Sequence, residues 1–229
     1  MRKRRKMSYG QNGQQALQIM PRVELAISQA ILDTLLTCNL DDLVMGLGIP
    51  DTWDVLIIGD GAGCWWDLSC GWGCILADHH FNRRRAFKGS MSGGTIAIAE
   101  LMPTIHGLLW YSEFHGHATK VRLGRGTINV HVVTDNETTV KHWSLLSKGG
   151  QAAYKIRKKR PLWSVLLQLE RAGYILHFHW VPRGTVGLQI LADEVAGIAR
   201  NTIAAFNLKP RNGVARDLNH EIYNINPNA

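Results

Sequence analysis

The sequence predicts an α/β domain in which a mixed five-stranded sheet is flanked by helices, with a helical extension at the N-terminus. Residues 55–58 are continuously apolar, as in a strand buried on both faces of a sheet, and residues 128–137 contain a β-branched run whose last apolar residue is Val133. Strand patterns come first along the chain and then alternate with helical patterns, which favours a mixed sheet covered by helices. With 229 residues, 45% of them hydrophobic, the chain can bury a substantial core without disulfide bonds.

Five segments have the character of strands. The first, residues 54–63, passes from an apolar run into glycines. Residues 72–77 and 83–89 are short strand candidates around a polar turn, so we expect a three-stranded meander with the first. The β-branched run in residues 128–137 predicts the fourth strand, and the alternation in residues 174–181 predicts the fifth.

Helical patterns occupy the stretches between the later strands. Residues 95–112 have apolar side chains at broadly helical spacing, with Pro103 inside the pattern. Because proline removes a backbone hydrogen bond, we expect the helix axis to bend just after Glu100. Further helices are predicted over residues 137–147, 161–172 and 188–204, with a flexible loop over residues 148–154.

These elements divide the chain into three parts. Residues 1–50 form a basic N-terminus followed by apolar helical segments, residues 51–205 form the core domain, and residues 206–229 are predicted to be a poorly ordered tail rich in asparagine. The first part is either a module that recruits a substrate or partner, or an extension that packs against the core. We favour the second interpretation, since thirty-odd residues rarely fold alone.

Four acidic residues stand out by their positions: Asp60, Glu100, Asp135 and Asp193. Asp60 and Asp135 each follow the apolar part of a predicted strand. If these two strands are neighbours, their carboxylates lie roughly 5 Å apart, one strand spacing, and are close enough to share divalent cations. Carboxylates in such positions cost burial energy unless something binds them.

The segments that contain these residues resemble the ribonuclease H type 1 family, within a wider superfamily of nucleases and integrases. The resemblance covers about residues 53–203 and is carried by GDGAG, AEL, VVTDN and HWVPR with LADEVA. It implies a ribonuclease H-like fold in which all four acids are catalytic and bind two Mg²⁺ ions, with Mn²⁺ as an alternative. It further implies hydrolysis of the RNA strand of an RNA/DNA hybrid, leaving 5′-phosphate and 3′-hydroxyl ends.

Basic residues suggest a nucleic acid partner. The net charge is +8, and the excess lies in residues 1–6, 83–85 and 155–160. Each block alone is more simply a solvated surface, but three together suit a polyanion. Some family members have a basic substrate-binding protrusion where residues 155–160 lie. We expect nucleic acid contacts at Gly61, Gly63, Thr95, Lys155, Arg157, Lys158, Lys159, Arg160 and Arg183.

The sequence departs from the family at two substrate-contacting positions. Asparagines often read the hybrid from the glutamate's helix, but here that stretch is Thr95, Ile96 and Ala97. The mobile histidine of the family's last loop is also missing from residues 183–189, where Arg183 is left to contact phosphate. Two alternatives therefore stay open: a DNA-directed enzyme such as a junction resolvase or integrase-like protein, and a nucleic-acid-binding protein of this fold without turnover.

The location is predicted to be the cytoplasm or another reducing intracellular compartment. No apolar stretch reaches the roughly 18 residues that a membrane helix needs, so no membrane association is expected. The basic start is followed by polar residues instead of an apolar signal region, and the chain has only four cysteines.

Overall fold

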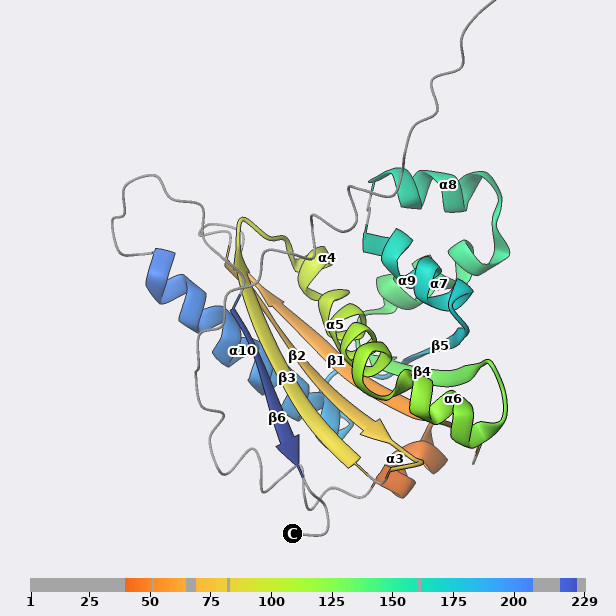
Figure 1. Cartoon of the computed structure of the whole chain (residues 1–229). Helices are drawn as coiled ribbons and strands as arrows, with labels where there is room; N and C mark the ends of the chain where they lie inside the picture. Colours follow the sequence, from red (N-terminus) through yellow and green to blue (C-terminus); the bar gives the residue numbers. More distant parts are fainter. Residues whose placement is uncertain are drawn as a thin grey trace, which may run out of the picture.

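The computed structural model contains a mixed six-stranded sheet with the strand order β5-β4-β1-β2-β3-β6 (Figure 1). The structure describes residues 40–50, 52–64, 69–81, 83–159, 162–207 and 219–225. β1, β2 and β3 form an antiparallel meander, β4 and β5 run parallel to β1, and β6 runs antiparallel to β3. The strands are β1 (Val55–Gly63), β2 (Ser69–Asp78), β3 (Arg83–Ser92), β4 (Ile128–Thr134), β5 (Tyr174–Trp180) and β6 (Asn219–Ile225).

The predicted mixed sheet flanked by helices is confirmed, with one strand more than expected. β6 lies in the segment assigned to a poorly ordered tail, and it extends the sheet by pairing along β3 from Ser90 to Arg84. Its sequence gave no apolar alternation that would have indicated a strand. The N-terminal extension, up to residue 39, lies outside the described residues.

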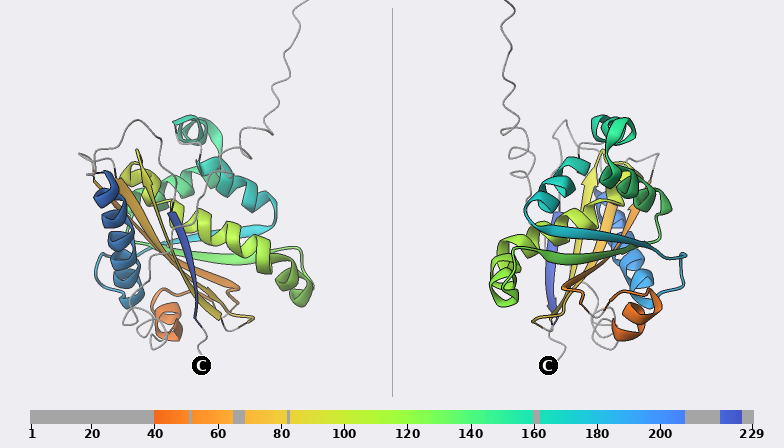
Figure 2. Two further views of the ribbon diagram at one scale, coloured as in Figure 1. Left: turned by 60° about the vertical axis from the view of Figure 1, so that its left-hand side comes forward. Right: turned by 90° about the vertical axis from the view of Figure 1, so that its right-hand side faces the viewer.

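Helices cover both faces of the sheet (Figure 2). One face carries a succession of helices between β3 and β5, including a π-helical segment, Ser112–Gly116. The other face carries α3 and α10. The helices are α3 (Leu40–Gly46), α4 (Ile96–Ala99), α5 (Met102–Tyr111), α6 (His117–Leu123), α7 (Glu137–Lys148), α8 (Gly150–Lys159), α9 (Leu162–Arg171) and α10 (Gly187–Asn207).

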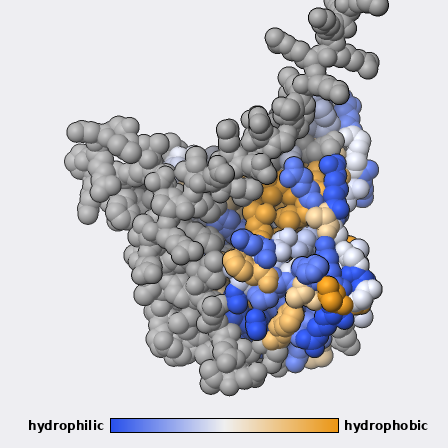
Figure 3. Space-filling view, in the orientation of Figure 1, coloured by the Kyte–Doolittle hydropathy of each residue, from blue (hydrophilic) through white to orange (hydrophobic). Residues whose placement is uncertain are grey.

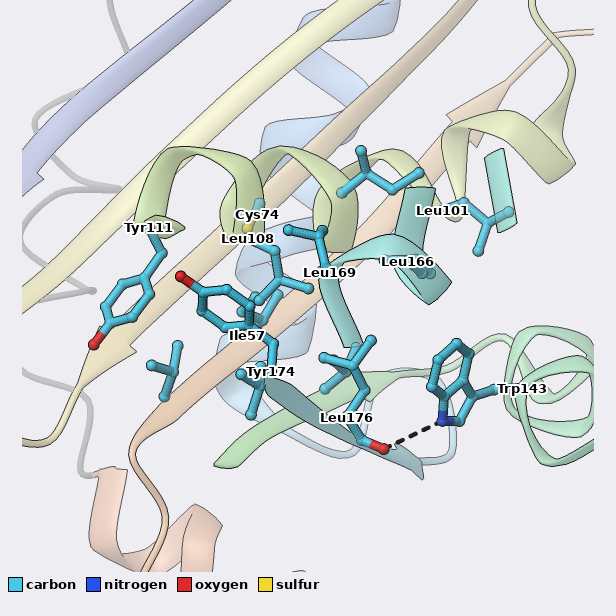
Figure 4. Packing of buried hydrophobic residues seen from close by; sticks show 14 of the residues in the cluster. Ile57, Cys74, Leu101, Leu108, Tyr111, Trp143, Leu166, Leu169, Tyr174 and Leu176 are labelled. Atoms are coloured by element: carbon cyan, nitrogen blue, oxygen red, sulfur yellow. Dashed lines mark hydrogen bonds between the residues drawn. The ribbon is translucent and has the colours of Figure 1, made fainter. Parts of the chain in front are cut away.

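The sheet separates two apolar cores because successive side chains of a strand point to opposite faces. Ile57 of β1 packs with Leu108 of α5 and Leu166 of α9 on one face (Figure 4). Leu56 and Ile58 pack against α3 and α10 on the other. Each fully buried side chain of this size stabilises the fold by about 1.5–3 kcal/mol. The two cores together fix β1, the strand that carries Asp60.

Instead of one bent helix, the chain forms two helices near Pro103. α4 ends at Ala99, α5 begins at Met102, and Pro103 occupies the first turn of α5, where its missing N–H group leaves no hydrogen bond unmade. Glu100 therefore lies in the break between two helices. The Thr95 hydroxyl caps α4 by accepting a hydrogen bond from the Ile98 amide at 3.3 Å.

The loop expected over residues 148–154 is instead largely the start of α8. Gly149 and Gly150 have φ angles of 73° and 82°, which let the chain reverse sharply after α7. Ala153 is buried and anchors α8 on its neighbours. The glycine pair and the polar sequence after it had indicated a loop.

Candidate metal centre

β1 and β4 bring Asp60 and Asp135 to the same edge of the parallel part of the sheet. The two strands are parallel neighbours, and their last aligned pair is Ile58 with Val133. β4 ends at Thr134, so Asp135 follows directly. We expected Asp60 at the end of its strand. It lies inside β1, because β1 continues to Gly63 and pairs there with β2. The prediction that these two strands are neighbours is nevertheless correct.

Glu100 joins the two aspartates from the break between α4 and α5. One carboxylate oxygen from each of Asp60, Glu100 and Asp135 lies within 4.8 Å of the others. Gly61 makes this approach possible, since a Cβ atom there would lie 2.4 Å from both the Ala99 carbonyl carbon and the Glu100 amide nitrogen. Only glycine therefore lets β1 pass this close to the backbone that carries Glu100.

Asp193 reaches the cluster from the second turn of α10. A hydrogen bond between its carboxyl group and Asp60 favours the protonated form of Asp60. α10 is held against this part of β1 by Gln189, whose side-chain amide donates to the Gly59 carbonyl at 3.2 Å. All four acids singled out in the sequence thus converge.

The cluster is electrostatically strained without a cation. Burial, followed by the hydrogen bond with Asp193 and the charges of Glu100 and Asp135, raises the pKa of Asp60 to about 8. Burial also raises the pKa of Glu100 to about 7, against a hydrogen bond from Asn136 that lowers it. The pKa of Asp135 is raised as well, mainly by burial. Neighbouring carboxylates that lose their protons here repel one another.

Arg183 supplies a positive charge beside these acids. Its guanidinium donates to Asp193 Oδ1 at 2.7 Å and lies 3.8 Å from Asp135 Oδ2. The pKa of Arg183 is raised, chiefly by Asp193. The side chain is 74% exposed, so it can leave this position at little cost in packing.

The donor set fits hard divalent cations. Asp60 Oδ2 and Glu100 Oε2 are buried and have no hydrogen-bond partner, and a buried polar atom left in this way costs free energy. Carboxylate oxygens are the ligands that Mg²⁺ and Mn²⁺ prefer. Asp60, Glu100, Asp135 and Asp193 are therefore suited to hold such ions.

Besides Arg183, three more of the residues expected to contact nucleic acid lie on β1 or at the start of α4, near this centre. The Gly61 amide donates to Asp60 Oδ1 at 2.7 Å, so in this structure it supports the carboxylate. Gly63 lies against the first turn of α4, where an added Cβ atom would be 3.1 Å from the Ile96 Cα atom. Thr95, just before that turn, is exposed.

The basic block after α7 forms much of α8. Lys155 is exposed, and Arg157, Lys158 and Lys159 follow on the same helix, whereas Arg160 lies outside the described residues. α8 is at the end of the molecule where α4 lies, the upper end in Figure 1. The basic helix and the α4 contacts are therefore at one end of the protein.

Asn136 was not singled out from the sequence. Its Oδ1 atom caps α7 by accepting from the Thr139 amide at 2.9 Å, and its side chain also hydrogen-bonds Glu100. An asparagine before a helical pattern is a recognisable N-cap signal. Its contact with Glu100 joins separate segments and leaves no trace in the local sequence.

The fold and this centre define an α/β protein in which clustered carboxylates, suited to a metal ion, lie beside the ends of two parallel strands. No protein-family model and no curated protein sequence matches the chain. Solved structures of ribonuclease H proteins are similar to it.

One is the N-terminal RNase H domain of a Mycobacterium tuberculosis protein, solved as a fusion with maltose-binding protein; it is 20% identical, with a TM-score of 0.46 over 67% of this chain and 97% of that chain. LC11-RNase H1 in complex with an RNA/DNA hybrid is 16% identical, with a TM-score of 0.46 over 66% and 99%. RNase H1 from Halobacterium salinarum is 18% identical, with a TM-score of 0.47 over 65% and 98%. These similarities concern the fold.

None of the described helices combines the length and the apolar character needed to cross a bilayer.

Proposed function

We propose that this protein is a magnesium-dependent endonuclease that hydrolyses the RNA strand of RNA/DNA hybrids and leaves 5′-phosphate and 3′-hydroxyl ends. The observation that carries the proposal is the convergence of four carboxylates with partnerless buried oxygens on Asp60 and Glu100. The sequence resemblance to the ribonuclease H type 1 family supports the same chemistry. Mn²⁺ is expected to substitute for Mg²⁺.

Each acidic side chain has a part in this proposal. Asp60, the most buried, would be the central ligand of the ions, with Glu100 and Asp135 as further ligands and Asp193 completing the set. When bound, such ions lower the pKa of an attacking water and stabilise charge on the leaving oxygen. Asn136 and Gln189 position the acids.

The surrounding residues would hold a duplex across the acids. Thr95 and Gly63 line the start of α4 beside the centre, and the basic residues of α8 provide charges for phosphates at the same end of the molecule. Arg183 is placed to exchange its contact with Asp193 for a phosphate oxygen once cations neutralise the acids.

A DNA-directed nuclease is the second candidate. It is favoured by one observation, the sequence Thr95, Ile96 and Ala97 at the start of α4 in place of hybrid-reading asparagines. A binding protein without turnover is disfavoured, because a cluster of buried acids is destabilising unless a cation balances it.

The test is cleavage of end-labelled RNA/DNA, RNA/RNA and DNA/DNA duplexes of one sequence in Mg²⁺, with the wild type beside Asp60→Asn. Glu194→Gln is the matched control, because it removes an exposed acid adjacent to Asp193. We expect the wild type and the control to cut only RNA in the hybrid, and Asp60→Asn to be slower by a factor on the order of a hundred or more. Cutting of DNA favours the second candidate, and binding without any cutting overturns the proposal.

A further inference from the structure

A cationic surface lies away from the carboxylates, around the start of β3 and the helices that follow. Six residues, here called the basic-aromatic patch, come together from separate elements: the β2–β3 turn, β3, the end of α5, the π-helical segment and α6. They are Phe81, Arg83, Arg85, Trp110, Phe114 and Arg122.

Aromatic rings form the apolar part of the patch. The Arg85 guanidinium lies 3.8 Å from the centroid of the Trp110 ring, and Phe114 stacks on Trp110 with centroids 5.4 Å apart and planes 29° apart. Trp110 is buried, but Phe114 is 59% exposed. The Phe114 ring is therefore exposed to solvent, and the buried Trp110 ring packs against it.

Arginines surround these rings. Arg83 and Arg122 lie 5.6 and 5.5 Å from the centroid of the Phe81 ring, and both are exposed. Within the described part of the chain, no carboxylate forms an ion pair with Arg83, Arg85 or Arg122. In Figure 3, hydrophilic and apolar side chains alternate over the part of the surface where α6 lies in Figure 1.

The arginines also act on one another and on a neighbouring histidine. The pKa of Arg85 is lowered by burial and by Arg83. The pKa of His115 is lowered by burial and then by Arg85. Of the nearby acids, Asp78 is buried and its Oδ1 atom accepts from two backbone amides, whereas Glu113 is exposed. Positive charge therefore predominates.

The patch is separate from the metal centre. Asp60 pairs with Gly73 of β2, and Gly73 pairs with Lys88 of β3. Arg85 lies three residues from Lys88, towards the start of β3. This displacement is about 10 Å along the strand and about 10 Å across two strand spacings. A ligand at the patch does not need to touch the carboxylates.

We propose that the basic-aromatic patch binds single-stranded nucleic acid, with an unpaired base stacked on Phe114 and phosphates at Arg83 and Arg122. Unpaired strands are held in this way, by cations that follow the backbone and by aromatic rings under the bases. A base within a duplex has both faces covered and cannot use an exposed ring. The binding is independent of cleavage and of metal ions.

The test is fluorescence anisotropy of labelled oligo(dT) and oligo(rU) of about 15 nucleotides with the full chain in EDTA, where no hydrolysis occurs. Phe114→Ala should weaken binding by about tenfold, and Phe114→Trp should restore it. Arg122→Gln should weaken binding and reduce the slope of log affinity against log salt by about 0.7. The matched controls are Met45→Ala, another exposed apolar residue, and Arg171→Gln, another exposed arginine; both should bind like the wild type.

Heparin separates base stacking from general attraction to polyanions, because it has charge but no bases. Phe114→Ala should bind heparin like the wild type, whereas Arg122→Gln should bind it more weakly. Equal oligonucleotide affinity for the wild type and Phe114→Ala would overturn the proposal, and so would no binding by the wild type. Equal losses of oligonucleotide and heparin binding in Phe114→Ala would also overturn it, since they indicate a general polyanion surface.

Discussion

At the scale of single residues, Asp60 has a strongly raised pKa. Its pKa rises from 3.8 to about 8 on folding, chiefly because the carboxylate is buried and meets other acids. The folded, metal-free protein therefore keeps a proton that the unfolded chain releases near pH 4. The stability that this proton provides is complete below that pH and is lost as the pH rises through about 8.

Asp60→Asn should therefore make the metal-free protein more stable at high pH. The amide keeps the shape of the carboxyl group and carries no charge at any pH. In EDTA, the melting temperature of Asp60→Asn minus that of the wild type should grow as the pH rises from about 5 to about 8. Comparing the two proteins cancels the contribution of other titrating groups, such as His131, whose pKa is lowered by burial.

Thermal unfolding followed by circular dichroism measures this difference. Mg²⁺ at pH 8 should stabilise the wild type more than the variant, since only the wild type keeps the Asp60 carboxylate. A difference that does not change with pH would contradict the assignment of Asp60 as a buried acid under repulsion.

At the scale of elements, the site depends on how closely β1 approaches the break between α4 and α5. Gly61→Ala should push the two apart, because its Cβ atom would lie 2.4 Å from backbone atoms of Ala99 and Glu100. We expect the free energy of unfolding to fall by about 1–3 kcal/mol and Glu100 to move away from Asp60. Both urea unfolding and hydrolytic activity should show the change.

Gly197→Ala is the control for this prediction. Gly197 lies in α10, and an added Cβ atom would meet nothing within 4 Å. Alanine is the better helix former, so this variant should be as stable as the wild type or more stable, by up to about 1 kcal/mol. A Gly61→Ala protein as stable and as active as Gly197→Ala would show that the close approach is not required.

The sequence predicted the elements whose signals are local. An apolar run identified β1, a β-branched run identified β4, and Pro103 indicated an irregularity in the helix beside Glu100. α8 was missed because the glycine pair before it and its polar composition are typical of loops. β6 was missed because pairing with the edge of β3 requires no alternating apolar pattern in a single strand.

The same distinction applies to the site. Asp60 and Asp135 could be predicted because each follows an apolar run, and neighbouring parallel strands bring such ends together. The contact of Asn136 with Glu100 and the position of Arg183 between two acids could not, because each joins segments that are separate in the sequence. Local patterns therefore indicate the candidate acids, and the fold is needed to find the residues that position them.

At the scale of the whole molecule, the clustered acids and the basic regions lie in different places. In a chain with a net charge of +8, four acids converge beside the ends of β1 and β4, while basic residues lie on α8 and in the basic-aromatic patch. A polyanion drawn to the basic regions would meet strong repulsion at the acids unless cations were bound there. Metal binding at the four carboxylates is therefore the central claim on which the proposed hydrolysis depends.

Titration with Mn²⁺ at pH 8, followed by electron paramagnetic resonance, tests that claim most directly, because the sharp signal of hydrated Mn²⁺ disappears as the ion is bound. The wild-type chain should bind up to two Mn²⁺ ions that Mg²⁺ displaces, and Glu194→Gln should behave in the same way. Asp60→Asn should lose at least one of these ions. A wild type that leaves all Mn²⁺ free, or that binds it no better than Asp60→Asn, would contradict the metal site and the proposed function with it.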